Sequence, residues 1–323
     1  MSGSRPESKL QSGGRNIHSP ESIRTEEKNG KTASLRDLLL KQTDIVVAPG
    51  CYDPMSAKLV ELYGFPCVYM TGNGNAASLL GMPDMGLITL TEVAERVHNT
   101  SSSVNIPVIV DADTGFGSIL NIRRTVKTLE AAGASAIQLE DQMDPKRCGH
   151  ELGREVIPLE DMVTKIRVAK EARSTDEMLI ISRTDARTTK GLDEAIEREN
   201  AYVDAGADIV FVESPESIDE LRLIREKIHA PILVNMVENG RTPYLPSKTL
   251  WKMGFNLVIF PASTILGALH GVKNVLEAIK NDGHVSRQDL IIPFSEYHEL
   301  TGFKEAEMFL RKYTRQDTIT TEK

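Results

Sequence analysis

Cysteine and aromatic residues are scarce in this sequence of 323 residues, which has three cysteines and 5% aromatic residues. This number is small and odd, so the cysteines cannot form a disulfide framework, and we expect all three to be thiols in a reducing compartment. No run of apolar residues reaches the roughly 18 that a membrane span requires. The net charge of -8 gives no basic surface for nucleic acid or for an anionic membrane. We therefore expect a soluble, cytoplasmic protein with neither as a partner.

Large apolar residues are nearly missing from residues 1–34, which are rich in Ser, Gly, Arg, Glu and Lys. Such a segment cannot bury enough surface to offset the entropy lost on ordering, so we expect a disordered or loosely docked tail. It also lacks the apolar stretch of a secretory signal, and its glutamates disfavour a mitochondrial transit peptide. The rest divides into a predicted catalytic domain over 35–283 and a helical extension over 284–323.

Short β-branched runs alternate with helix-length amphipathic stretches along the predicted catalytic domain. Near-continuous apolar strands that are each followed by a helix are typical of a parallel sheet covered on its outside. Eight such units predict a (β/α)8 barrel of the TIM type, with a doubly wound sheet as the alternative. The predicted strands are 45–48, 67–70, 108–111, 137–140, 179–182, 209–212, 232–235 and 257–260.

Polar residues follow these strands repeatedly, where the active sites of barrel enzymes form. The second strand leads into Tyr69, Thr71, Gly72 and Asn73, and the third into Asp111 and Asp113. The next four strands end at Glu140, Arg183, Glu213 and Asn235. We predict the site at this end of the barrel.

Asp111 and Asp113 are two residues apart, so both can point to one side of a strand and offer oxygens to a hard cation. A helix cap or a turn is the alternative explanation. Glu140 from the next strand and Asp84 from a preceding loop would extend the acidic set. Mg²⁺ suits such a site and Mn²⁺ could replace it. Zinc is disfavoured, because the single Cys-X-His pair has no second ligand pair at the right spacing.

The segment Lys146-Arg147-Cys148-Gly149-His150 places a thiol between two cations and a histidine. A lowered pKa there would suit acid–base chemistry, although most cysteines are simply small buried residues. The polar neighbours and Gly149 favour a mobile catalytic loop, whereas Cys51 and Cys67 are predicted to be buried.

Two further patterns have alternative explanations. The segment from Thr71 to Gly74 is either an ordinary turn or a set of backbone N–H groups that hold a carboxylate. Arg183 is either a surface ion-pair partner of Asp185 or a bidentate carboxylate binder, and its place at a strand end favours the second role.

Taken together, these motifs resemble the isocitrate lyase and phosphoenolpyruvate mutase superfamily, in its Cys-bearing lyase branch. The similarity runs from about residue 35 into the C-terminal region, and Cys148-Gly149-His150 is its most specific part. Phosphonate-bond members carry other residues there, so mutase chemistry is disfavoured. The resemblance implies a homotetramer in which the helix after the barrel is exchanged between subunits. The matching segments are 69–72, 80–84, 111–117, 140–142, 146–150, 183–186 and 235–236.

Roles for single residues follow from this resemblance. Asp113 would bind Mg²⁺ directly, with Asp84, Asp111 and Glu140 acting through waters. Thr71, Gly72 and Asn73 would hold the product. Arg183, Gly149, His150 and Asn235 would contact the substrate, and Glu213 would contact these residues rather than the substrate. Cys148 would be the general acid, and Lys146 and Arg183 would stabilise the carbanion. The base is open, and Tyr69 is one candidate.

The implied reaction cleaves a 2-hydroxy dicarboxylate of the 2,3-dimethylmalate type to pyruvate and a short carboxylate. The alternative is 2-methylisocitrate, which yields pyruvate and succinate, and a second alternative is oxaloacetate hydrolysis or decarboxylation. Members that cleave methylisocitrate carry a Thr after the strand-seven Asn and an Arg after strand eight. Here Val237 and Leu266 or its neighbours take those places, so both contacts to a third carboxylate are expected to be missing. A barrel that binds a metabolite without catalysis is a third hypothesis.

Overall fold

The computed structural model describes residues 33–149 and 153–314. The predicted N-terminal tail, apart from its last two residues, lies outside the described residues, and so does His150.

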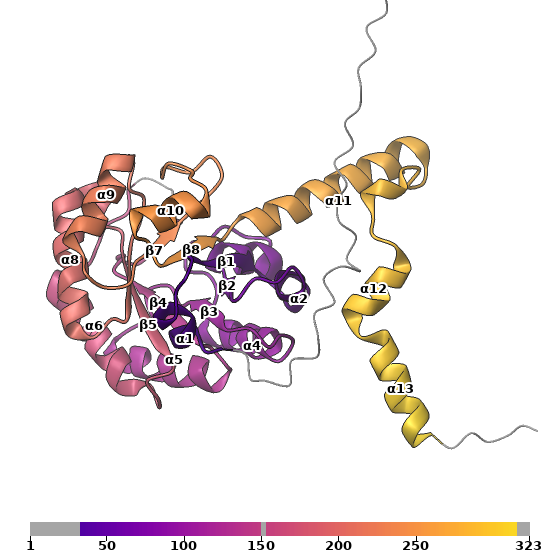
Figure 1. The fold of residues 1–323 in the computed structure, drawn as a ribbon, viewed down its shortest axis with the longest axis horizontal. Coiled ribbons are helices and arrows are strands. Elements are labelled where there is room, and N and C mark those ends of the chain that lie inside the picture. The colour runs from indigo at the N-terminus through magenta and orange to yellow at the C-terminus, as the bar shows by residue number, and fades with distance from the viewer. Residues whose placement is uncertain (1–32, 150–152, 315–323) are drawn as a thin grey trace, which may run out of the picture. The chain divides into compact units, whose positions relative to one another are not determined.

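Eight parallel strands form one sheet in the order β6-β5-β4-β3-β2-β1-β8-β7. A bridge between Val210 and Ile232 brings the two outer strands together, so the sheet curls into a barrel (Figure 1). The predicted barrel is confirmed, each of the eight predicted strands is present, and a doubly wound open sheet is excluded. The strands are β1 (Val46–Cys51), β2 (Val68–Met70), β3 (Val108–Asp111), β4 (Ala136–Glu140), β5 (Leu179–Thr184), β6 (Ile209–Val212), β7 (Leu233–Asn235) and β8 (Leu257–Phe260).

Helices follow the strands and form an outer ring (Figure 1). Their ends carry the expected signals: Asp53 and Thr89 cap two helices through reciprocal hydrogen bonds, and Gly206 and Gly254 end two others in the left-handed conformation. The helices after the first seven strands are α2 (Pro54–Leu62), α3 (Gly72–Asn75), η2 (Ala76–Leu80), α4 (Leu90–Ser101), α5 (Ile119–Ala131), α6 (Leu159–Ala172), α7 (Ala186–Lys190), α8 (Leu192–Ala205), α9 (Ile218–Lys227) and α10 (Ser247–Met253). The helix after β8, α11 (Ser263–Asp282), runs outward from the barrel (Figure 1).

A short helix, α1 (Leu35–Leu40), closes the amino end of the barrel. Leu35 is 1% exposed and packs with the apolar side chains inside the barrel. Arg36 forms an ion pair of 3.1 Å with Asp208, which lies just before β6. The polar carboxyl ends of the strands therefore lie at the opposite end.

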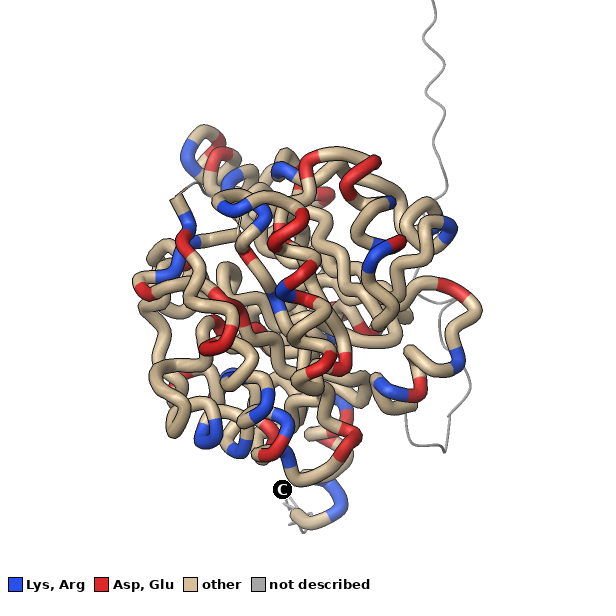
Figure 2. Tube along the Cα trace, turned by 90° about the vertical axis from the view of Figure 1, so that its left-hand side faces the viewer, with Lys and Arg blue, Asp and Glu red and all other residues tan. Residues whose placement is uncertain are grey.

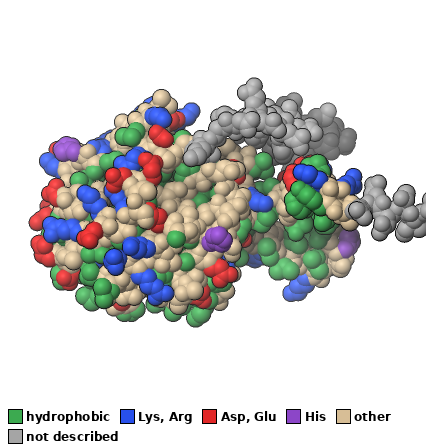
Figure 3. Space-filling view, turned by 90° about the horizontal axis from the view of Figure 1, so that it is seen from below, with side chains coloured by type: hydrophobic (Ala, Val, Ile, Leu, Met, Phe, Trp, Pro, Cys, Tyr) green, Lys and Arg blue, Asp and Glu red, His purple; other side chains and the backbone are tan. Residues whose placement is uncertain are grey.

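The predicted helical extension contains η3 (Gln288–Leu290), α12 (Phe294–Thr301) and α13 (Phe303–Tyr313). Large apolar side chains along α11 to α13 are exposed, and they gather at the right of Figure 3. Lys and Arg are interspersed with Asp and Glu along the described backbone (Figure 2). Among the described helices, none has the length and apolar character to cross a bilayer.

Candidate active site

A cavity of about 160 Å³ opens at the carboxyl ends of the strands. It is smaller than the ~300–1,000 Å³ pockets that hold drug-sized ligands, so it suits a small metabolite. Tyr69, Thr71, Asn73, Asp84 and Asp111 line one part of it. Cys148, Gly149, Arg183, Glu213 and Asn235 line another, so the structure brings together most of the residues predicted from the sequence.

Asp111 and Asp113 both approach Gly72, although not by strand alternation alone. Strand β3 ends at Asp111, and Asp113 follows in a left-handed turn with φ of 49°. The N–H of Gly72 donates to Oδ2 of Asp111 at 3.3 Å. A Cβ at Gly72 would lie 2.8 Å from that oxygen, so this position needs glycine.

Lys146 lies within the acidic part of the site. Its Nζ is 2.6 Å from Oδ1 of Asp84 and 2.5 Å from Oδ1 of Asp113. Burial raises the pKa of Asp113 to about 7, although the Lys146 ammonium opposes the shift. Burial lowers the pKa of Lys146, but the surrounding carboxylates outweigh it and raise the value well above normal. Lys146 is therefore a buried cation held by carboxylates.

Glu140 gives the strongest sign of a cation site. It is 1% exposed, and neither carboxylate oxygen has a hydrogen-bond donor in the described residues, although Nη1 of Arg183 lies 3.2 Å from Oε2. Buried carboxylate oxygens without donors are unusual. Asp84, Asp111 and Asp113 offer further carboxylate oxygens nearby in the site, and oxygen is the ligand type that Mg²⁺ prefers. In the part of the chain that is described, no three acidic, His or Cys groups already converge as a metal centre.

Arg183 is buried among carboxylates rather than paired at the surface. Its Nε and Nη2 donate to the two oxygens of Asp185, each at 3.0 Å. Glu213 lies 3.6 Å away and accepts from Nδ2 of Asn235 at 3.2 Å. The Arg183 guanidinium also lies 5.4 Å from the Phe211 ring. Its position is therefore fixed from several strands.

Gly149 is packed directly against these groups. A Cβ there would lie 2.6 Å from Oε2 of Glu213 and would also collide with Nη2 of Arg183. Its carbonyl accepts from Oγ of Ser214 at 2.8 Å. The neighbouring Cys148 is partly exposed and lines the cavity. Cys51 and Cys67 are buried, as predicted, and none of the three forms a disulfide.

The remaining predicted residues have more structural partners than expected. Tyr69 donates from its hydroxyl to Oε1 of Gln138 at 3.0 Å, and burial raises its pKa well above normal, so it is a neutral phenol. Thr71 caps α3 by accepting from the N–H of Gly74. The segment from Thr71 to Gly74 is thus a helix start.

Several residues near the site escaped the sequence reasoning. Ser214 and Arg154 give no sequence pattern, and Gln138 lies inside a strand. Asp185, which the sequence suggested as an ion-pair partner of Arg183, is that partner, but inside the protein rather than at its surface. Leu266 is a correction: it is 49% exposed on α11, whereas Pro261 and Ala262 line the cavity after β8. Residues just after a parallel strand face the cavity, while those one helical turn later do not.

Comparisons with known proteins show the family to which the fold belongs. The family model described as phosphoenolpyruvate phosphomutase matches residues 35–280. The chain is 47% identical over 274 residues to 2,3-dimethylmalate lyase of Eubacterium barkeri, covering 84% of this chain and 95% of that protein. It is 45% identical over 276 residues to 2-methylisocitrate lyase of Aeropyrum pernix, covering 84% and 88%.

Among solved structures, oxaloacetate acetylhydrolase in complex with the inhibitor 3,3-difluorooxalacetate is similar, with a TM-score of 0.83 and 32% identity. The match covers 87% of this chain and 96% of that one. The similarity therefore spans the whole barrel and its site.

Proposed function

Because the chain belongs to the phosphoenolpyruvate phosphomutase family, we propose that it is a Mg²⁺-dependent carbon–carbon lyase. Its substrate is a 2-hydroxy dicarboxylate of the 2,3-dimethylmalate type, which it cleaves to pyruvate and a short carboxylate. The observation that carries this proposal is a cavity with two kinds of wall. Its lining combines acidic side chains and Arg183 with Val237, Ile259 and Pro261, which carry no side-chain charge.

These apolar residues bear on the choice of substrate. Methyl groups would pack against them, whereas a third carboxylate would lose its hydration without gaining a partner. A site of this kind discriminates strongly against a substrate with an additional charge. The apolar wall therefore favours a methylated dicarboxylate over 2-methylisocitrate.

The acidic side chains fit a divalent cation. Asp113 would hold it directly, and Asp84, Asp111 and Glu140 would reach it through waters. When bound, Mg²⁺ would supply Lewis-acid stabilisation of negative charge on the substrate oxygens. Lys146, which now bonds to Asp84 and Asp113, would then share or yield those contacts.

The protein's own groups divide the remaining work. Thr71, Gly72 and Asn73 would hold the end of the substrate that becomes pyruvate, and Asn235 and His150 would contact its other groups. Transfer of the hydroxyl proton to a base in the site lets the carbon–carbon bond break, leaving a keto acid and a carboxylate-stabilised carbanion. Arg183 and Lys146 offset its negative charge, and the Cys148 thiol gives it a proton.

The test is pyruvate release measured with 2,3-dimethylmalate, 2-methylisocitrate, citramalate and oxaloacetate, with and without a chelator. We expect pyruvate from 2,3-dimethylmalate and loss of turnover on chelation. Preferred turnover of 2-methylisocitrate would overturn the substrate assignment. Metal-independent turnover would overturn the metal assignment, and no pyruvate from any hydroxy acid would overturn the lyase.

A second candidate is oxaloacetate hydrolysis, because the fold is similar to oxaloacetate acetylhydrolase. The two activities differ in their need for the thiol. Cys148→Ala should abolish pyruvate release if Cys148 protonates a carbanion. Near-normal turnover of oxaloacetate by the same variant would favour the second candidate.

We also infer a homotetramer in which α11 and the helices after it are exchanged between subunits. Leu266, Leu269, Leu276 and Ile279 are each 45% or more exposed along α11, and their spacing places them on one face. An apolar groove of about 590 Å³ lies between α2 and the start of α11. A second copy could cover both surfaces. The three cysteines form no disulfide, which supports our further proposal of a cytoplasmic location.

A further inference from the structure

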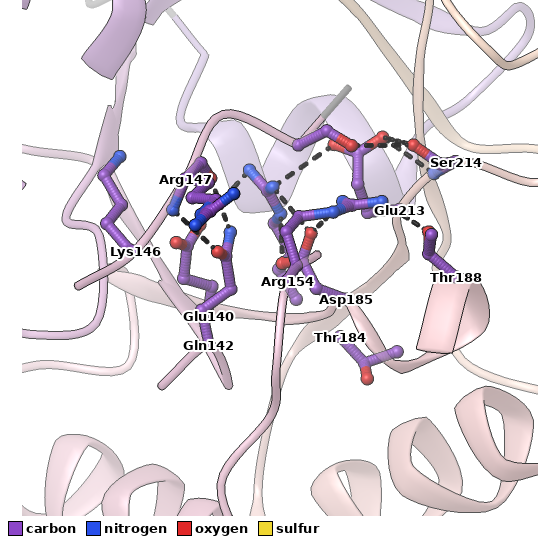
Figure 4. Close-up of polar contacts among 12 residues, drawn as sticks. Glu140, Gln142, Lys146, Arg147, Arg154, Thr184, Asp185, Thr188, Glu213 and Ser214 are labelled. Atoms are coloured by element: carbon purple, nitrogen blue, oxygen red, sulfur yellow. Dashed lines mark hydrogen bonds and ion pairs between the residues drawn. The ribbon is translucent and has the colours of Figure 1, made fainter. Parts of the chain in front are cut away.

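Arg154 is an arginine buried outside the substrate cavity. It is 1% exposed, and it does not line the cavity. Its Nη1 forms an ion pair with Oδ1 of Asp185, and its Nη2 donates to Oγ1 of Thr188 on α7 (Figure 4). A buried guanidinium has a large desolvation cost, which its carboxylate partner must offset.

The carboxylate of Asp185 is shared between two arginines. Its Oδ1 accepts from both Arg154 and Arg183, while its Oδ2 accepts from Nε of Arg183. The backbone N–H of Asp185 is itself held by Oδ1 of Asp141 at 2.9 Å. Asp185 is fully buried, so its carboxylate has little freedom to turn. The orientation of Arg183 therefore depends on a group that Arg154 helps to hold.

Charge balance gives Arg154 a second effect. Arg183 is surrounded by the carboxylates of Asp185, Glu140 and Glu213. Negative charge on these groups would repel an anionic substrate. By pairing with Asp185, Arg154 offsets one of these charges at a position that the substrate does not reach.

We propose that Arg154 is a positioning residue that acts through Asp185 to aim the guanidinium of Arg183 at the cavity and to keep its charge available to an anion. This inference rests on the proposed function only in naming a carboxylate as the anion. The binding of a carboxylate tests it independently of turnover.

The probe is oxalate, a small dicarboxylate, and the readout is its dissociation constant by calorimetry in the presence of Mg²⁺. Arg154→Met should weaken oxalate binding by about 10- to 100-fold, the range typical of groups that orient a binding residue. Arg154→Lys keeps the charge beside Asp185 and should recover most of the affinity. Thr188→Val, which leaves the ion pair in place, should have little effect.

Two comparisons separate positioning from a general loss of stability. Arg173 forms a largely buried ion pair of 2.6 Å with Asp208 at the amino end of the same strands, so Arg173→Met is a matched control that should leave oxalate binding unchanged. In an Arg183→Lys background, Arg154→Met should have little additional effect, because both changes remove the same interaction.

Wild-type oxalate affinity in Arg154→Met would overturn the proposal. The proposal would also be overturned if Arg154→Met weakened oxalate binding as much in the Arg183→Lys background as in the wild-type background. If Arg154→Met does not fold, Arg154→Lys provides the test. An Arg154→Lys protein that binds oxalate no better than the Arg183→Lys protein would also contradict the proposal. Absence of lyase activity with these affinity changes intact would instead reject the proposed function and leave the role of Arg154 standing.

Discussion

At the scale of single residues, position 149 has room for glycine but for no residue with a side chain. Its α-carbon lies against Arg183 and Glu213, two buried side chains held by further partners. Any side chain there must displace one of them. The same backbone segment carries Cys148, so a shift at Gly149 would also move the proposed proton donor.

Gly149→Ala should therefore reduce kcat/KM for the preferred hydroxy acid by about 100-fold, since a displacement of about 1 Å in an active site can have that effect. Steady-state kinetics together with thermal unfolding would check this. Gly271→Ala on α11 is the matched control, because nothing lies within 4 Å of its added methyl group. Unchanged kinetics in Gly149→Ala would show that Arg183 and Glu213 can move at no cost.

Residue chemistry also explains which parts of the site the sequence could predict. Asp111, Glu140 and Asn235 end strands, and Glu213 directly follows β6, so their placement follows from the barrel alone. The contacts of Arg154 and Ser214 depend on the conformation of loops, which leaves no periodic pattern in the sequence. His150 lies outside the described residues, so its predicted role stays a prediction.

At the scale of elements, α1 is a small helix with a large effect on the barrel. Leu35 enters the apolar interior between the strands, while Leu40 on the same helix is 77% exposed. Arg36 fixes the helix to Asp208. The helix thereby closes the amino end of the barrel.

Leu35→Ala should lower the free energy of unfolding by about 2–5 kcal/mol, because it leaves a cavity in a packed interior. Leu40→Ala should change it by less than about 0.5 kcal/mol, as expected at an exposed position. Urea denaturation followed by circular dichroism measures both. Equal effects of the two substitutions would contradict the packing of α1, and the kinetics of the folded Leu35→Ala protein should be those of wild type.

The strands could be predicted because each is a short apolar run between glycines and helix patterns. The helical extension could be predicted as helical, but its division into α12 and α13 at Gly302 could not be placed in advance. Gly302 adopts a left-handed conformation and ends α12. The side chains of these helices are largely exposed to solvent in this structure, so no buried face gives the sequence a recognisable helical periodicity.

At the scale of the whole molecule, α11 exposes more apolar surface than a barrel helix normally does. Leu269 is 58% and Leu276 is 59% exposed, on one face of the helix. Such a face in a globular protein commonly marks an interface. The proposed exchange of helices would bury it against another copy.

Leu269→Lys combined with Leu276→Lys should dissociate the proposed tetramer, since each leucine buried there would contribute about 1.5–3 kcal/mol and would be present in every copy. Light scattering coupled to size-exclusion chromatography gives the mass. Leu120→Lys on α5, where the leucine is 80% exposed, is the control and should not alter it. A wild-type protein that elutes as a monomer would rule out the exchange.

The bridge between Val210 and Ile232 is the sole backbone pairing that the described residues provide between β6 and β7. These two strands carry Glu213 and Asn235, whose side chains bond to each other across that gap. The site thus spans the junction of β6 and β7, a seam of the barrel wall that has little backbone pairing. A substrate that contacts both sides would cross-link the seam, and part of its binding free energy would resist opening of the entire barrel.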